Sequence, residues 1–141
     1  MQTPKDFSLK SADSLTLAKR IVATLIEKKA EDVRLYYVKE KSSITDYYVN
    51  ATGRSSTQVA SLADEVAFKT EESGRAPLRI EGREGNAWLL VDYGDVIVNI
   101  FDRPSREFYN FDRLLFEDAR VDISDIIEEI DKKFDINKVE D

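Results

Sequence analysis

Two aspartates within an apolar stretch are the first residues whose type and spacing could do chemistry. Asp92 and Asp95 flank Tyr93-Gly94 in WLLVDYGDVIVNIF, residues 88–101. If Tyr93-Gly94 forms a two-residue hairpin turn, the two carboxylates lie opposite each other, where like charges destabilise a strand pair. The pair could bind a metal ion, serve the turn, or attract a cationic partner. A metal site would need more ligands than two carboxylates, and the sequence places no third acid beside them.

A second candidate is TGRSS, residues 52–56. A glycine turn between a strand and a helix can bind an anion, because free N–H groups and the helix dipole point outwards there. The simpler interpretation is that Gly53 makes the turn and one of the serines caps the helix. Magnesium-dependent nucleotidyl transfer would also need two carboxylates on one face of a following strand. Asp64 and Glu65 come next, but helical neighbours do not share a face, which weakens an enzymatic interpretation.

Composition excludes several classes of enzyme. The 141 residues contain no histidine and no cysteine, which removes Ser-His-Asp catalysis, thiol chemistry, disulfides and the usual zinc sites. The N-terminus is polar and no apolar run approaches the length of a membrane helix, so we expect a cytoplasmic protein without a membrane partner.

Charge is distributed unevenly along the chain. The net charge is −7, and residues 116–141 carry −6 of it, with ten acidic and four basic residues. Nucleic-acid binding relies on clustered Lys and Arg, which this chain lacks, so we expect little direct contact with nucleic acid. A basic protein is the more natural partner.

The elements that must position these residues follow from hydrophobic periodicity and turn signals. Helices are predicted at 13–28, 55–73, 104–115 and in the tail, where Asp122 is the expected cap. Strands are predicted at 33–38, 46–52 and 77–82 and in the hairpin of residues 88–101. The tail helix has an apolar stripe of Ile123, Ile126, Ile127, Ile130 and Phe134. This order predicts an α/β fold with a mixed five-stranded sheet flanked by helices.

Pairing across the predicted turn separates the hairpin into two faces, because side chains alternate along a strand. One face is aliphatic and suits the core: Leu89, Val91, Val96, Val98 and Ile100. The other is mixed: Trp88, Leu90, Asp92, Asp95, Ile97, Asn99 and Phe101. Aromatic anchors in an apolar patch with charges at one end are typical of a protein interface. An alternative is that the tail helix covers this face.

The motifs KSSITDYYVNATGRSSTQVASLADEV, PLRIEG, WLLVDYGDVIVNIF and REFY closely resemble the ribosomal silencing factor family, also called RsfS or Iojap. The resemblance extends from about residue 14 to residue 115. It implies a nucleotidyltransferase-like but non-catalytic fold in residues 1–115, without a metal or cofactor, and leaves residues 116–141 as an acidic, helical extension.

The resemblance also implies a function. Members of the family bind the large ribosomal subunit through ribosomal protein number fourteen, block association with the small subunit, and repress translation when nutrients are scarce. Carried over by position, the partner-binding residues are expected around the hairpin: Trp88, Leu90, Asp92, Tyr93, Asp95, Ile97 and Asn99.

This chain departs from many relatives at two positions, with Asn99 in place of a histidine and Leu115 in place of a tryptophan. The extension could cover the hairpin face when the protein is off the ribosome. Two other functions stay open: a magnesium-dependent nucleotidyltransferase or nucleotide-binding protein that uses Gly53, Ser55, Asp92 and Asp95, and a homodimer that pairs the hairpin face with itself.

Overall fold

The computed structural model describes residues 8–115 and 117–139, with side chains described as far as residue 133. Within that part of the chain, six strands form one mixed sheet in the order β3-β4-β5-β2-β1-β6. The strands are β1 (Glu31–Tyr37), β2 (Tyr47–Gly53), β3 (Arg79–Glu81), β4 (Trp88–Asp92), β5 (Val96–Asp102) and β6 (Arg120–Val121). The predicted α/β class with a mixed sheet is confirmed, with one strand more than expected.

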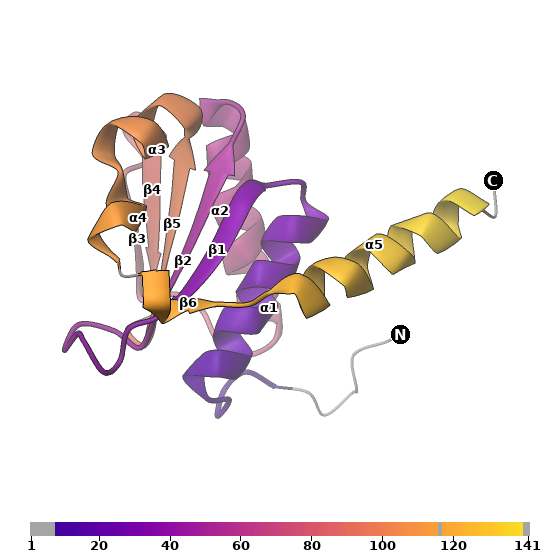
Figure 1. The fold of residues 1–141 in the computed structure, drawn as a ribbon, viewed down its shortest axis with the longest axis horizontal. Coiled ribbons are helices and arrows are strands. Elements are labelled where there is room, and N and C mark those ends of the chain that lie inside the picture. The colour runs from indigo at the N-terminus through magenta and orange to yellow at the C-terminus, as the bar shows by residue number, and fades with distance from the viewer. Residues whose placement is uncertain (1–7, 116, 140–141) are drawn as a thin grey trace.

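Strand direction changes at the centre of the sheet. β2 and β5 run parallel, while the other neighbouring strands run antiparallel. The parallel pair needs a long crossover connection, and α2, β3 and β4 supply it (Figure 1).

Two long helices cover one face of the sheet, α1 (Ser14–Glu27) and α2 (Ser56–Glu72). The side chain of Asp13 caps α1 by accepting a hydrogen bond of 2.8 Å from the N–H of Thr16, as its polar oxygen and position favour. The buried stripe of α2 has helical spacing and includes Val59, Leu62, Ala63 and Val66. These helices pack on the aliphatic face of the hairpin, whose five predicted core residues are all fully buried.

The opposite face carries a short helical arm, α3 (Arg103–Tyr109) and α4 (Phe111–Leu114). A single helix was predicted over 104–115, and that prediction is wrong in one respect. The backbone of Asn110 adopts the left-handed conformation, with φ 49° and ψ 47°, which ends α3 and turns the chain into α4. Asparagine tolerates this conformation better than most residues.

The tail adds the edge strand β6 and then α5 (Ser124–Val139). The side chain of Asp122 accepts a hydrogen bond of 2.9 Å from the N–H of Ser124, as the predicted cap should. Ile123 and Ile126 pack against the main core, and Ile130 is buried. Phe134, the last member of the predicted stripe, lies outside the residues whose side chains are described.

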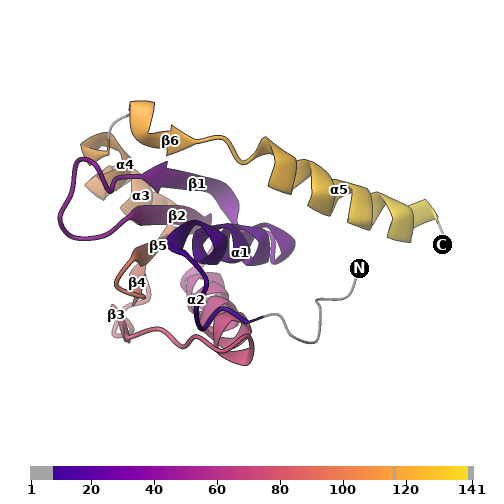
Figure 2. The same ribbon diagram turned by 90° about the horizontal axis from the view of Figure 1, so that it is seen from below.

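α5 begins beside α1 and projects away from the sheet (Figures 1 and 2). The alternative that the tail helix covers the Trp88 face is therefore wrong for this structure, because the arm of α3 and α4 occupies that side instead. The division of the chain at residue 115 stays a prediction; the sheet itself extends past it through β6.

Candidate partner-binding site

The hairpin turn differs from the predicted one. Asp92 pairs with Ile97, and the N–H of Tyr93 donates a hydrogen bond of 2.9 Å to the carbonyl of Val96, so the two turn residues are Gly94 and Asp95. The prediction that Asp92 faces Asp95 is wrong. Gly94 has φ +89°, and the first position of a common two-residue hairpin turn requires such a positive φ, which glycine adopts without strain.

Each aspartate is paired with an arginine of the same chain. Asp95 lies in the turn and accepts hydrogen bonds of 3.2 and 2.5 Å from the guanidinium of Arg75. Asp92 is buried. Its carboxylate accepts a hydrogen bond of 3.1 Å from Arg79 and another of 2.8 Å from the N–H of Gly94. Among the described residues, no cluster of three or more acidic side chains is arranged to hold a metal ion.

Three arginines around β3 bind acidic residues of the same chain. Arg79 lies 3.4 Å from Glu81 as well as 3.1 Å from Asp92, its neighbour across the strand pair. Arg75 binds the turn, and Arg83 lies 2.6 Å from Asp64 on α2.

Trp88 lies on the mixed face, at the end of the hairpin that is opposite the turn. Its ring contacts three aromatic rings, with centroids 4.8 Å from Phe101, 5.0 Å from Tyr109 and 5.9 Å from Phe111. Its indole N–H donates a hydrogen bond of 2.9 Å to the Oδ1 of Asn99. Two of its three ring contacts come from the arm, so α3 and α4 cover part of the face that the sequence suggested was open.

The structure brings five of the seven predicted site residues onto one face: Trp88, Leu90, Asp92, Ile97 and Asn99. Of these, only Trp88 and Leu90 are half-buried, and the other three are buried. Asp95 is half-exposed in the turn. Tyr93 lies in the opposite face, where its hydroxyl is 2.7 Å from the Oγ1 of Thr70 and burial raises its pKa to about 12. Of the seven predicted site residues, only Trp88, Leu90 and Asp95 are therefore directly accessible to a partner.

The arm contributes exposed apolar residues that the sequence did not single out. Phe108, Tyr109 and Leu114 are 80%, 53% and 71% exposed. Leu114 also borders a groove of about 220 Å³, whose other lining residues are Val38, Lys41, Ser42, Tyr48, Phe111 and Leu115. The sequence analysis predicted one continuous helix over 104–115. It therefore did not separate α3 from α4 at Asn110, and the exposed residues of the two short helices could not be assigned. The signal available was REFY, which lies within α3.

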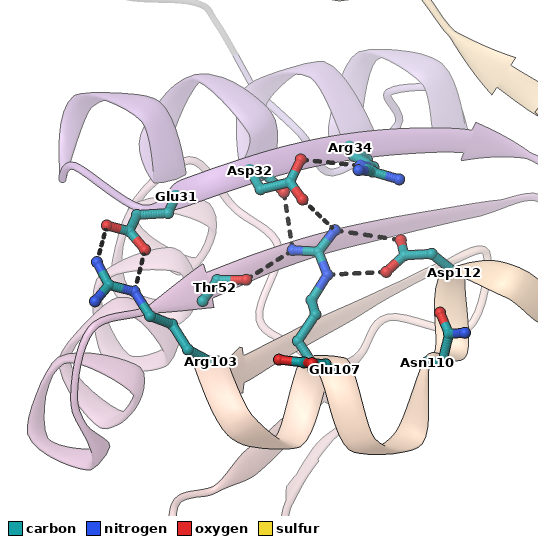
Figure 3. A pocket seen from close by; sticks show the side chains of 9 residues that line it. Glu31, Asp32, Arg34, Thr52, Arg103, Glu107, Asn110 and Asp112 are labelled. Carbon is teal, nitrogen blue, oxygen red and sulfur yellow. Dashed lines mark hydrogen bonds and ion pairs between the residues drawn. The ribbon is translucent and has the colours of Figure 1, made fainter.

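A polar cluster fixes the arm to the sheet (Figure 3). The guanidinium of Arg106 donates three hydrogen bonds: one of 2.8 Å to the carboxylate of Asp112, one of 2.8 Å to the carbonyl of Asp32 and one of 2.9 Å to the hydroxyl of Thr52. Burial alone would raise the pKa of Asp112, but hydrogen bonds from Arg106 and Asn50 outweigh it and hold the pKa below its ordinary value. Asp112 is thus a partly buried, ionised acceptor.

The cluster borders a cavity of about 320 Å³ at the end of β2. Figure 3 shows Glu31, Asp32, Thr52 and Asp112 around it, with Glu31 facing Arg103 across the rim. Arg106 and Asp112 were not singled out from the sequence, since they are six residues apart and either side of the break at Asn110.

The glycine turn has the simpler of its two roles. The Oγ of Ser55 accepts a hydrogen bond of 3.1 Å from the N–H of Gln58 and so caps α2. A Cβ at Gly53 would lie 2.8 Å from the Cγ2 of Val59, so glycine allows β2 and α2 to approach closely. The interpretation of a serine as the helix cap is confirmed, while Gly53 is the last residue of β2 and serves the close approach of strand and helix.

The four residues of the nucleotidyltransferase alternative do not meet. Gly53 pairs with Asp102 at one end of the sheet, while Asp92 pairs with Ile97, which lies beside Tyr48 near the other end. Five residues of extended strand separate the two positions, or about 16 Å. The carboxylates of the hairpin therefore cannot act on a group bound at the Gly53 turn.

No helix among the described residues is long and apolar enough to cross a membrane.

Comparison with known proteins places this architecture in a family. The family model described as "Ribosomal silencing factor during starvation" matches residues 11–140. Proteins named ribosomal silencing factor RsfS from Halalkalibacterium halodurans and Haemophilus influenzae are each 35% identical; the matches cover 72% and 71% of this chain and 86% and 98% of those proteins. The chloroplastic Iojap protein of Arabidopsis thaliana is 28% identical, over 42% of its own length.

Two solved structures share the fold. A crystal structure from Chromobacterium violaceum has a TM-score of 0.71 at 30% identity and covers 73% of this chain and 86% of that one. One from Bacillus halodurans has a TM-score of 0.64 at 34% identity, with coverages of 77% and 96%.

The chain therefore belongs to the family of ribosomal silencing factors. Its relatives are named as silencing factors and not as enzymes, in agreement with the prediction that this chain is not an enzyme. The family resemblance seen in the motifs is confirmed.

Proposed function

We propose that this chain is a cytoplasmic translation repressor that binds the large ribosomal subunit through ribosomal protein number fourteen and sterically blocks association with the small subunit. Family membership supports the ribosomal role. The observation that carries the choice of site is Trp88, a half-buried tryptophan beside exposed rings of the arm.

The proposed partner face combines two kinds of residue. Trp88, Leu90 and the exposed edge of Asp95 contact the partner directly, and Phe108 and Tyr109 of α3 widen the apolar area. Asp92, Tyr93, Ile97 and Asn99 act from below, by holding the turn and the strands that carry these contacts. An aromatic anchor surrounded by weaker contacts is the arrangement that concentrates affinity in few residues.

Charge favours a basic partner. The chain carries a net charge of −7, which slows nonspecific binding to RNA phosphates and accelerates encounter with a basic protein surface. The proposed contact is therefore with protein rather than with ribosomal RNA. Off the ribosome the same apolar face would be available for a homodimer, which sizing at several protein concentrations tests.

Sedimentation with purified ribosomal subunits tests the proposal. The protein should follow the large subunit and reduce its joining with the small subunit. Trp88→Ala should weaken large-subunit binding by about 2 kcal/mol or more, as truncation of an anchor does. Phe68→Ala is the matched control, because Phe68 is also an exposed ring, 57% accessible, but lies on α2 across the sheet. Normal co-sedimentation of Trp88→Ala would refute the site, and binding to the small subunit alone would refute the function.

A further inference from the structure

A continuous chain of side-chain hydrogen bonds crosses the sheet from the arm to Trp88. The Nδ2 of Asn50 donates a hydrogen bond of 2.9 Å to the carboxylate of Asp112. The Nδ2 of Asn99 in turn donates a hydrogen bond of 3.1 Å to the Oδ1 of Asn50. The indole N–H of Trp88 then donates a hydrogen bond of 2.9 Å to the Oδ1 of Asn99. Asn50 and Asn99 are direct neighbours across the parallel pair of β2 and β5, so the chain links α4 to β4 through two strands.

The direction of this chain is determined at one end. An ionised carboxylate only accepts hydrogen bonds, so Asn50 must turn its amide nitrogen towards Asp112. Its oxygen is then left to accept from Asn99, and the oxygen of Asn99 is left to accept from the indole. Both amides are buried, where a reversed amide would leave a donor or an acceptor unpaired, which is unfavourable away from water.

The carboxylate at the origin is itself held firmly. Arg106 donates to both of its oxygens, at 2.8 and 3.2 Å, and the hydroxyl of Tyr36 donates 3.1 Å to one of them. Neither α3 nor α4 contains a buried residue. The arm therefore depends on this polar anchor, and on aromatic contacts with Trp88 and Tyr48, for its position on the sheet.

We infer that Asp112 is a positioning residue of the partner face, which orients the indole of Trp88 through Asn50 and Asn99. Packing against the neighbouring rings sets the plane of the indole, and the hydrogen bond sets which edge points into the sheet and which faces the partner. This role rests on the proposed function in so far as Trp88 contacts the ribosome, but the orientation itself can be measured without a ribosome.

The test uses the fact that Trp88 is the single tryptophan of the chain, so its indole N–H gives one resonance in a nitrogen-proton NMR spectrum. Asp112→Ala removes the origin of the chain, and Asn50→Leu interrupts it while the contact between Arg106 and Asp112 is kept. In both variants the indole resonance should move upfield, and its exchange with solvent should accelerate roughly tenfold, as expected on losing a hydrogen bond of about 1.4 kcal/mol.

Two matched variants serve as controls. Tyr36→Phe removes one donor to Asp112 but leaves the chain to Trp88 intact. Asp64→Ala removes an exposed carboxylate, paired with Arg83, at a distant surface. Neither should move the indole resonance. Urea unfolding of each variant verifies that it is folded. An unchanged indole resonance in folded Asp112→Ala and Asn50→Leu would overturn the inference and leave the proposed function standing.

Large-subunit binding provides the second measurement. Asp112→Ala and Asn50→Leu should weaken binding about tenfold or more, which is about 1.4 kcal/mol, while the two controls bind normally. If the indole moves but affinity is unchanged, although Trp88→Ala abolishes binding, the positioning role is overturned. If Trp88→Ala itself binds normally, the proposed function fails and the positioning role fails with it.

Discussion

Asp92 and Asp95 illustrate how strongly a residue's role depends on strand register. With a turn at Gly94-Asp95, one acid is buried beneath Arg79 and the other binds Arg75 at the rim. Alternation still places Leu89, Val91 and Val96 on the core face, because the pairing is displaced by an even number of positions. The two carboxylates therefore stabilise the hairpin of this chain before they meet any partner.

Tyr93 predicts a measurable dependence of stability on pH. Burial raises the pKa of its phenol to about 12, above the value of about 10 expected in the unfolded chain. The unfolded chain therefore loses this proton first, so the stabilisation is complete below pH 10 and is lost as the pH rises towards 12.

Tyr93→Phe removes this titration. Its free energy of unfolding, measured with urea, should decline less between pH 10 and pH 12 than that of the wild type, by about 1 to 3 kcal/mol. Tyr109→Phe, which changes an exposed ring, should keep the wild-type decline. Equal declines for all three proteins would contradict the buried role of Tyr93.

At the scale of elements, two helix starts show how the polar residues that follow a strand are used. The helix after TGRSS begins with a side-chain cap from Ser55. The helix after β5 begins with a cap from Asp102, whose Oδ1 accepts a hydrogen bond of 2.8 Å from the N–H of Ser105. In both cases the polar residue after the strand stabilises the helix start and needs no ligand.

Ser55→Ala should lower the free energy of unfolding by about 1 kcal/mol, the usual cost of losing an N-cap. Ser56→Ala, one position later in the first turn, should change it by much less, because alanine is a good helix former and no cap is lost. Chemical denaturation of the two variants checks this. A larger loss for Ser56→Ala would show that the cap has been assigned to the wrong serine.

Most elements of the fold could be predicted from local patterns, since helical stripes, Val- and Tyr-rich strands and turn glycines are short-range signals. The break at Asn110 and the strand β6 could not. A left-handed residue is permitted by asparagine but not demanded by it, and two residues give no periodicity. For the candidate site, Trp88 followed from alternation, whereas Asp112 depends on contacts 62 residues apart with Asn50.

For the molecule as a whole, the tail behaves as part of the body over its first turns. β6 covers the edge of β1, and the start of α5 packs beside α1 (Figure 2). The acidic residues whose side chains are described in α5, which are Asp125, Glu128, Glu129 and Asp131, are exposed to solvent. We therefore expect the tail to contribute stability and not to compete with the partner for the hairpin.

Ile130→Ala should destabilise the protein by about 2 kcal/mol, because the side chain is buried, at 6% exposed, and its removal leaves a cavity. Ile127→Ala, in the same helix but 39% exposed, should cost clearly less. Thermal unfolding of both variants measures the difference. Binding of Ile130→Ala to the large subunit should equal that of the wild type, and tighter binding would instead indicate that the tail shields the partner face.

The strand order also determines when this protein can fold during its own synthesis. The central partner of β2 is β5, and the chain must emerge as far as Asp102 before that pair can form. At about 5 to 20 residues per second, the nascent first half spends several seconds with the backbone groups along one edge of β2 unpaired. Pairing between strands so distant in sequence is intrinsically slow. We therefore expect a nascent chain that stops at Glu72 to stay protease-sensitive, and protection to appear only once β5 has left the exit tunnel.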